Sequence, residues 1–278
     1  MRYIDDRFIN DLLGGKLSYF FEQVKNNRDT LSLEVREGYI NIYYRGGSLL
    51  KIEQRKNRYA FKFDAKYCKN KKNTENYDQL SELDKYDILA FKNNFSLMMC
   101  EMDTWFDEHP KEERDYQHKL LVNNPGIVDI EYQIKNKMRL DMLYFADGTL
   151  YIVENKFGNG AIGGKSGMSE HYKDICELLN SSNIREEMID SVCHITKAKK
   201  ALGLTDNLIE KNDIKNIEIL FLMANYIPKG KVLINELDKM DGTVTTNLLM
   251  TTSDQDKISL TQIESLSLLK DRLEYLRK

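Results

Sequence analysis

The sequence predicts a mixed α/β protein, in which a central mixed sheet is flanked by helices and preceded by an N-terminal helix and an antiparallel β-meander. Four short β-prone runs, separated by turn residues, follow the first helical pattern. From residue 111 onward the pattern reads helix, three strands, helix and strand, which is typical of a sheet with helices on its faces. The run IEILFLMA at 217–224 is continuously apolar, as in a strand buried on both faces.

The N-terminal half begins with an amphipathic helix over 5–27, which Gly14 and Gly15 divide into two pieces. The turn signals Glu-Gly, Gly-Gly and Lys-Asn then separate the four β-prone runs, and these predict a meander of antiparallel strands. The runs are 31–35, 39–45, 49–53 and 59–63. The polar, lysine-rich segment 66–78 indicates an exposed loop, and apolar spacing predicts a helix over about 84–106.

The C-terminal half predicts a helix over 111–122, which Asn-Asn-Pro-Gly ends. Expected strands, turns and helices follow in this order: a strand at 127–134, a turn at 135–137, a strand at 139–145, an Ala-Asp-Gly-Thr turn, a strand at 150–156, a glycine-rich loop at 158–167 and a helix at 169–179. The last segment, 258–278, has the pattern of an amphipathic helix. We expect it to be core, with a homodimer face as the alternative. We place the domain boundary between residues 107 and 108, which gives a module 1–107 with a recognition or regulatory role and a domain 108–278.

Composition limits the class of protein. The chain has 278 residues, 31% of them charged, and a formal net charge of −3, which argues against binding nucleic acid by bulk positive charge but not against a local basic groove. Its four cysteines are far apart and its four histidines lack metal-ligand spacing, so we expect no structural zinc site. No apolar run approaches the length of a membrane helix, and the N-terminus does not have a signal-peptide pattern. We therefore expect a cytoplasmic protein with no membrane partner.

Charged residues interrupt the apolar pattern at the ends of two predicted strands. In LYIVENK, Glu154 and Lys156 share a face, because side chains alternate along a strand. If Asp141 of the preceding strand lies across the hairpin from Glu154, two carboxylates and one ammonium group converge. Carboxylates hold hard divalent cations, and a lysine beside them can act on a phosphate or a water molecule. This is the chemistry that phosphodiester cleavage requires.

The motif resembles that of the PD-(D/E)XK nuclease superfamily. Asp141 matches the acidic residue of the second core strand, and Glu154-Asn155-Lys156 matches the acidic-x-Lys element of the third. The resemblance covers about residues 111–224 and implies a restriction-endonuclease-like core. Leu140 stands where the nominal motif has proline, as in many members. Glu170-His171-Tyr172 replaces the glutamine-based motif of one branch, which leaves the subfamily open.

The resemblance implies a metal-dependent phosphodiesterase, a nuclease and more specifically an endonuclease, with Mg²⁺ or Mn²⁺ as cofactor. Asp141 and Glu154 would be metal ligands, the carbonyl of Asn155 a further one, and Lys156 the cation that acts on water or phosphate. Family members often carry a glutamate on the preceding helix. Glu113 is the candidate, with Glu112 as fallback, because Glu113 and Gln117 share the helical stripe of Leu120 and Leu121. DNA is the expected substrate, and the family's habits suggest restriction or anti-phage defence as a context.

Three further residues are candidate nucleic-acid contacts. Lys165 lies in the glycine-rich loop beside the predicted site, Gln117 lies on the helix of Glu113, and His171 opens the helix after the loop. The same loop, GNGAIGGKSG, has Asn159 where a phosphate-binding P-loop needs glycine, which disfavours a nucleotide hydrolase.

Two alternatives stay open. The meander interleaves aromatic residues with arginine and lysine, which suits nucleic-acid binding but equally suits a half-buried sheet with a solvated basic face. The whole chain could also be a catalytically silent nucleic-acid-binding or scaffold protein that keeps the nuclease fold. The presence of all three motif residues favours the enzyme.

Overall fold

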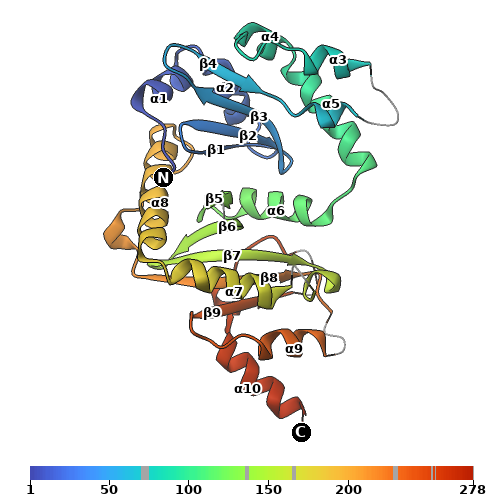
Figure 1. Ribbon diagram of the computed structural model, residues 1–278, viewed down its shortest axis with the longest axis vertical. Coiled ribbons are helices and arrows are strands. Elements are labelled where there is room, and N and C mark those ends of the chain that lie inside the picture. The colour runs from blue at the N-terminus through green and yellow to red at the C-terminus, as the bar shows by residue number, and fades with distance from the viewer. Residues whose placement is uncertain are drawn as a thin grey trace. The chain divides into compact units, whose positions relative to one another are not determined.

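The computed structural model describes residues 1–69, 75–134, 138–164, 167–227, 231–251, 253 and 255–277, with side chains to residue 272 (Figure 1). Within these ranges the chain divides into two compact units. The first comprises residues 1–118 and 194–208, and the second 119–193 and 209–278. Both units are discontinuous in sequence. The boundary expected between residues 107 and 108 stays a prediction.

The first unit contains the antiparallel meander that the turn signals predict. Its sheet has the order β1-β2-β3-β4, and every neighbouring pair is antiparallel. The strands are β1 (Leu31–Val35), β2 (Tyr39–Tyr44), β3 (Gly47–Gln54) and β4 (Tyr59–Lys62). The N-terminal helical pattern is broken at its glycines, as expected, into α1 (Asp6–Leu13) and α2 (Ser18–Asn26).

The rest of the first unit is helical, and here one prediction is wrong. Part of the expected exposed loop at 66–78 forms a 3₁₀ turn, η1 (Ala65–Cys68), and a short helix, α3 (Asn76–Ser81), while residues 70–74 lie outside the described residues. Tyr67 is buried because its ring packs edge-on against Phe106 and Trp105. Those two residues belong to α5 (Phe95–Glu108), which follows α4 (Ile88–Asn93).

The second unit is built on a mixed six-stranded sheet with the order β10-β9-β8-β7-β6-β5 (Figure 1). β5, β6 and β7 form an antiparallel meander, β8 and β9 run parallel to β7, and β10 is antiparallel to β9. The strands are β5 (Ile127–Gln133), β6 (Arg139–Ala146), β7 (Thr149–Phe157), β8 (Asn216–Ala224), β9 (Thr246–Met250) and β10 (Glu264–Ser265). β8 is buried from Ile219 to its end, as its apolar run predicts.

Helices and 3₁₀ turns connect these strands. They are α6 (Glu112–Asn123), η2 (Asn159–Ala161), α7 (Met168–Leu179), α8 (Ser182–Ala201), η3 (Lys211–Asp213), α9 (Val232–Asp238), η4 (Leu260–Gln262) and α10 (Leu266–Arg277). α6 and α8 each contribute residues to both units. α7 lies along β7 and β8, so it covers part of the sheet (Figure 1).

Two turns were expected between the antiparallel strands β5, β6 and β7. The Asp147–Gly148 turn between β6 and β7 has φ values of 49° and 77°, which is the left-handed pair of a type I′ turn. It confirms the expected hairpin. The turn expected at 135–137 lies outside the described residues.

The helix expected over 258–278 begins only at Leu266. Residues 264–265 instead pair with β9 as β10, in register with Asn247 and Leu248. Local amphipathic spacing does not reveal this pairing, because it depends on the edge that β9 offers.

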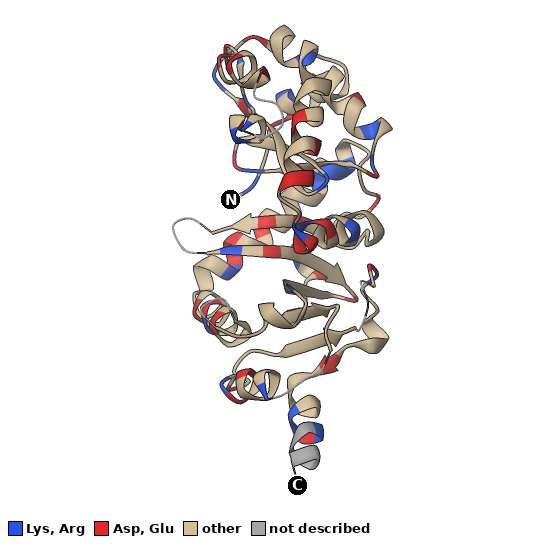
Figure 2. Cartoon of the chain, turned by 90° about the vertical axis from the view of Figure 1, so that its right-hand side faces the viewer, with Lys and Arg blue, Asp and Glu red and all other residues tan. Residues whose placement is uncertain are grey.

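Charged residues of both signs are interspersed over the helices and connections (Figure 2). None of the helices, as far as the structure describes them, combines the length and the apolar character that crossing a membrane demands.

Candidate active site

The hairpin of β6 and β7 brings Asp141 to the end of β7 that carries Glu154 and Asn155. Its ladder runs without a bulge from the turn to the pair Met142 and Val153, where the recorded pairing ends, and the same register continued by one residue would set Asp141 opposite Glu154. The two-residue turn fixes this register, because a slip of one residue would send every side chain to the other face. Leu143 pairs with Ile152 on the same face as the two carboxylates, so the acidic pair continues an otherwise apolar stripe.

The Asp141 side chain, and not a main-chain carbonyl of β6, accepts the hydrogen bond from one main-chain N–H group of β7. Its Oδ2 accepts a hydrogen bond from the main-chain N–H of Asn155 at 2.9 Å. In an antiparallel pair, the N–H and C=O groups of one residue point toward the same neighbouring strand. The carbonyl oxygen of Asn155 is therefore on the Asp141 side of β7.

Glu154 is fully buried, yet one of its carboxylate oxygens has no hydrogen-bond partner in the part of the chain that the structure describes. Oε2 accepts a hydrogen bond from Nδ1 of His171 at 2.5 Å. Oε1 is also buried and makes no hydrogen bond to any described residue. Because a buried carboxylate oxygen without a partner costs free energy, such an oxygen is normally satisfied by a water molecule or a bound group.

His171 joins this pair from the neighbouring helix. It lies in the first turn of α7, and its side chain is 26% exposed. The hydrogen bond to Glu154 raises the pKa of His171 and outweighs burial, which acts in the opposite direction. The charges of Lys156 and Asp141 also act on this pKa, the first lowering it and the second raising it.

Lys156 has the position that strand alternation predicts. It follows Glu154 by two residues on β7 and is 5% exposed. A lysine this deeply buried requires charged or polar groups around it, because transferring an ammonium group out of water is costly. The candidate site therefore consists of two carboxylates, one lysine and one histidine. Glu154 and Lys156 lie near the end of β7, Asp141 lies on β6, and His171 lies on α7.

The side chain of Asn155 points away from this group. As the residue between Glu154 and Lys156, it lies on the opposite face of β7. Its Oδ1 and Nδ2 atoms are buried and make no hydrogen bonds to described residues. Only the main chain of Asn155 is thus available to the site.

A second buried carboxylate anchors the start of α7. Glu236 of α9 accepts hydrogen bonds from the main-chain N–H of Ser169 at 3.0 Å and from its hydroxyl at 2.6 Å. Burial alone would raise the pKa of Glu236, but hydrogen bonds from Lys239 and Ser169 outweigh it and lower this pKa. Since Ser169 lies two residues before His171, the contact fixes the helical turn that carries the histidine. Nothing in the sequence around Glu236 signals this role.

Glu113 does not lie where the helical stripe predicts. The stripe is buried at Tyr116 and Leu120, but Glu113 is exposed and Gln117 is only half-buried. Glu113 is in the acidic first turn of α6, where carboxylates are stabilised by the helix N-terminus while remaining solvated. The expectation that Glu113 lies on a buried stripe is therefore wrong.

Glu113, its fallback Glu112 and Gln117 belong to the first unit, whereas Asp141, Glu154, Lys156 and His171 belong to the second. Lys165 lies outside the described residues. The sequence missed the contact between His171 and Glu154, because the rotation of α7 over the strand is set by packing and not by local spacing.

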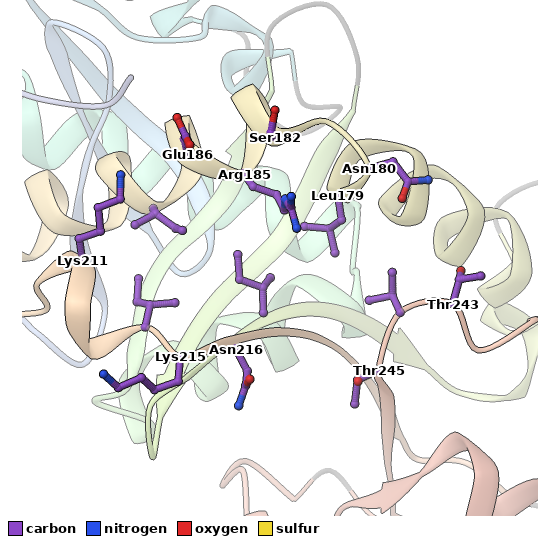
Figure 3. Close-up of a pocket in the computed structure, with 14 residues that line it drawn as sticks. Leu179, Asn180, Ser182, Arg185, Glu186, Lys211, Lys215, Asn216, Thr243 and Thr245 are labelled. Atoms are coloured by element: carbon purple, nitrogen blue, oxygen red, sulfur yellow. The ribbon is translucent and has the colours of Figure 1, made fainter.

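A separate cavity of about 590 Å³ opens at the other end of the same strands (Figure 3). Its lining includes Asn216, which pairs with the first residue of β7. In Figure 3 the Arg185 side chain points toward Leu179. Lys215 donates to the carbonyl of Asn212, and Lys211 lies 4.0 Å from Asp190, so these two cations are engaged elsewhere. The candidate site does not include this cavity.

Across the described parts of the chain, no three side chains among His, Cys, Asp and Glu are grouped so that they could hold a metal ion. Protein donors for a cation at the hairpin would thus be two carboxylates and a main-chain carbonyl. Comparison with known protein families, with curated proteins and with solved structures found no match.

Proposed function

We propose that the protein is a Mg²⁺-dependent nuclease that hydrolyses phosphodiester bonds, with DNA as the expected substrate and Asp141, Glu154 and Lys156 as its site. One observation carries the proposal. A fully buried carboxylate, Glu154, keeps one oxygen without a hydrogen-bond partner among the described residues, and Asp141 accepts a hydrogen bond from the main-chain N–H of the next residue, Asn155. A polar group buried in this state is expected where a ligand completes the coordination.

The residues fit a hard divalent cation. Asp141 and Glu154 would hold it through carboxylate oxygens, together with the carbonyl oxygen of Asn155, and Mg²⁺ takes few protein ligands of this kind while keeping water and phosphate oxygens. Bound there, the cation would supply a more acidic water molecule and would offset negative charge on the phosphate. Lys156 shares the face of Glu154, and its ammonium group would orient the attacking water or neutralise a phosphate oxygen.

The order of elements gives independent support. α6 is followed by the antiparallel strands β5, β6 and β7, then by α7 and α8, and then by β8, which is parallel to β7. This is the order that the resemblance to PD-(D/E)XK nucleases implies for a restriction-endonuclease-like core. We propose that core for the second unit.

The proposal is tested with plasmid DNA, single-stranded DNA and RNA, each incubated with Mg²⁺, Mn²⁺ or EDTA. The variants are Asp141→Asn, whose amide oxygen still accepts from Asn155, and Lys156→Met, which keeps most of the side-chain volume. We expect each to lower metal-dependent cleavage by about 100-fold or more, because each removes a charge that acts on the reacting phosphate.

Asp147→Asn is the matched control. It makes the same change on the same hairpin, in an exposed turn position at φ 49° that asparagine tolerates. Cleavage that survives both site substitutions would contradict the assignment. Tight nucleic-acid binding without cleavage under any of the metal conditions would favour a catalytically silent protein of the same fold.

A further inference from the structure

We propose that His171 is a positioning residue, whose Nδ1–H group fixes Oε2 of Glu154 and leaves Oε1 presented to the divalent cation. The inference rests on the proposed function, because it assigns His171 a role toward the same cation. Its basis is the difference between the two carboxylate oxygens of Glu154. Oε2 is hydrogen-bonded to Nδ1 of His171 at 2.5 Å, whereas Oε1 is buried and has no hydrogen-bond partner among the described residues.

The side chain of Glu154 requires such a restraint. A glutamate has three rotatable bonds, and holding its carboxylate in one orientation costs conformational entropy. The strand fixes only the direction in which the side chain leaves β7. The hydrogen bond from α7 fixes the carboxylate itself, so the cation would not have to order it on binding.

The position of His171 is itself determined by packing. Glu236 binds the N–H and hydroxyl groups of Ser169 at the start of α7, and His171 follows two residues later. Burial of Tyr172 and Ile175 fixes the face that α7 turns toward the sheet. The packing of α7 therefore fixes the position of the His171 imidazole, as a preorganised site requires.

Nδ1 cannot bind the cation while it donates to Glu154. A histidine ring whose Nδ1 carries the proton has only Nε2 as an acceptor, and it is Nδ1 that faces the carboxylate. This geometry favours an arrangement in which the carboxylate binds the metal and the histidine binds the carboxylate.

A histidine that only stabilises the fold by pairing with a buried carboxylate would make the same contact with Glu154. The test must therefore separate this stabilising role from the positioning role. His171→Asn keeps a donor at the same distance from Cβ, because Nδ2 of asparagine and Nδ1 of histidine are both bonded to Cγ. His171→Leu has the shape of asparagine but no donor. His109→Ala is the histidine control, because His109 is exposed and stacks on Trp105 in the first unit.

The affinity of each protein for Mn²⁺ is measured by titration calorimetry in the absence of nucleic acid, after circular dichroism has verified the fold. We expect His171→Leu to weaken Mn²⁺ binding by about 10-fold to 100-fold, the usual effect of losing a group that orients a metal ligand. His171→Asn should restore most of this loss, and His109→Ala should bind as the wild type does.

The other possible outcomes contradict either the role of His171 or the proposed function, and they can be told apart. If the wild type binds Mn²⁺ and cleaves nucleic acid while His171→Leu binds Mn²⁺ equally well, the inference is overturned and the proposed function stands. If His171→Asn binds Mn²⁺ as weakly as His171→Leu, or is itself unfolded, donation from Nδ1 is not the role. If the wild type neither binds Mn²⁺ nor cleaves, the proposed function fails and the inference fails with it.

Discussion

At the scale of single residues, the same physical rule governs the site and His118, a histidine of the first unit. A buried ring nitrogen or carboxylate oxygen must find a partner or change its protonation equilibrium. In the site, His171 and Glu154 partly satisfy one another. In the first unit, His118 places Nε2 2.8 Å from the carbonyl oxygen of Asp29, while its Nδ1 is buried without a partner among the described residues.

His118 makes the stability of the protein depend on pH. Burial lowers the pKa of His118, and the hydrogen bond with the carbonyl of Asp29 opposes this shift only in part. The unfolded state therefore binds a proton more readily than the folded state. The neutral form's contribution to stability is complete above the unfolded pKa of about 6.5 and is lost as pH falls through the folded pKa.

We expect His118→Gln, whose Nε2 still donates to Asp29, to reduce the loss of stability between pH 7 and pH 5. The free energy of unfolding in urea is measured at several pH values for both proteins. Parallel pH profiles for wild type and variant would contradict this assignment.

At the scale of secondary-structure elements, the sequence predicts contacts that a neighbouring turn determines. It does not predict contacts that depend on how distant elements pack together. The approach of Asp141 to the end of β7 follows from the register that a two-residue Asp-Gly turn sets, so it was predicted. The contact of His171 with Glu154 depends on how α7 is rotated over β7. The pairing of β10 with β9 depends on an edge strand that is distant from any turn signal. These tertiary features have no local pattern, and the exposed position of Glu113 belongs with them.

The anchor of α7 by Glu236 gives a prediction about an element. Replacing Glu236 with alanine removes the acceptor of two groups on Ser169, which is 7% exposed. Unpaired buried donors cost about 1–3 kcal/mol each, so we expect Glu236→Ala to lower the free energy of unfolding by about 2 kcal/mol or more. Urea denaturation measures this change. Glu186→Ala is the control, since Glu186 is exposed on α8. Equal stability of the two variants would show that the anchor contributes nothing.

At the scale of the whole chain, neither unit is a single stretch of sequence. The first unit needs residues 194–208, which follow most of the second unit along the chain. Sequence patterns describe neighbours along the chain, so they suggest one boundary and cannot show that a later helix returns to an earlier sheet. The return is recorded by contacts such as that of Arg28 with the carbonyl of Gly203 at 2.7 Å.

The buried pair of Glu34 and Lys199 is the clearest of these long-range contacts. Glu34 of β1 is 1% exposed, and its Oε2 lies 2.7 Å from the ammonium nitrogen of Lys199, 165 residues later on α8. Removing one partner of a buried ion pair takes away compensation for the other charge, which costs up to about 3–5 kcal/mol. Replacing both partners removes that charge as well. The penalty should therefore be larger for one substitution than for two.

We expect Lys199→Met to lower the free energy of unfolding by about 3 kcal/mol, and the double variant Glu34→Gln with Lys199→Met to recover part of that loss. Urea denaturation of both single variants and the double variant measures the coupling. Lys200→Met is the matched control, because Lys200 is the exposed neighbour of Lys199 on the same helix. A double variant as unstable as the sum of its single changes would mean that the two charges do not depend on one another. In that case the ion pair would contribute no coupling energy to the return of residues 194–208 to the first unit.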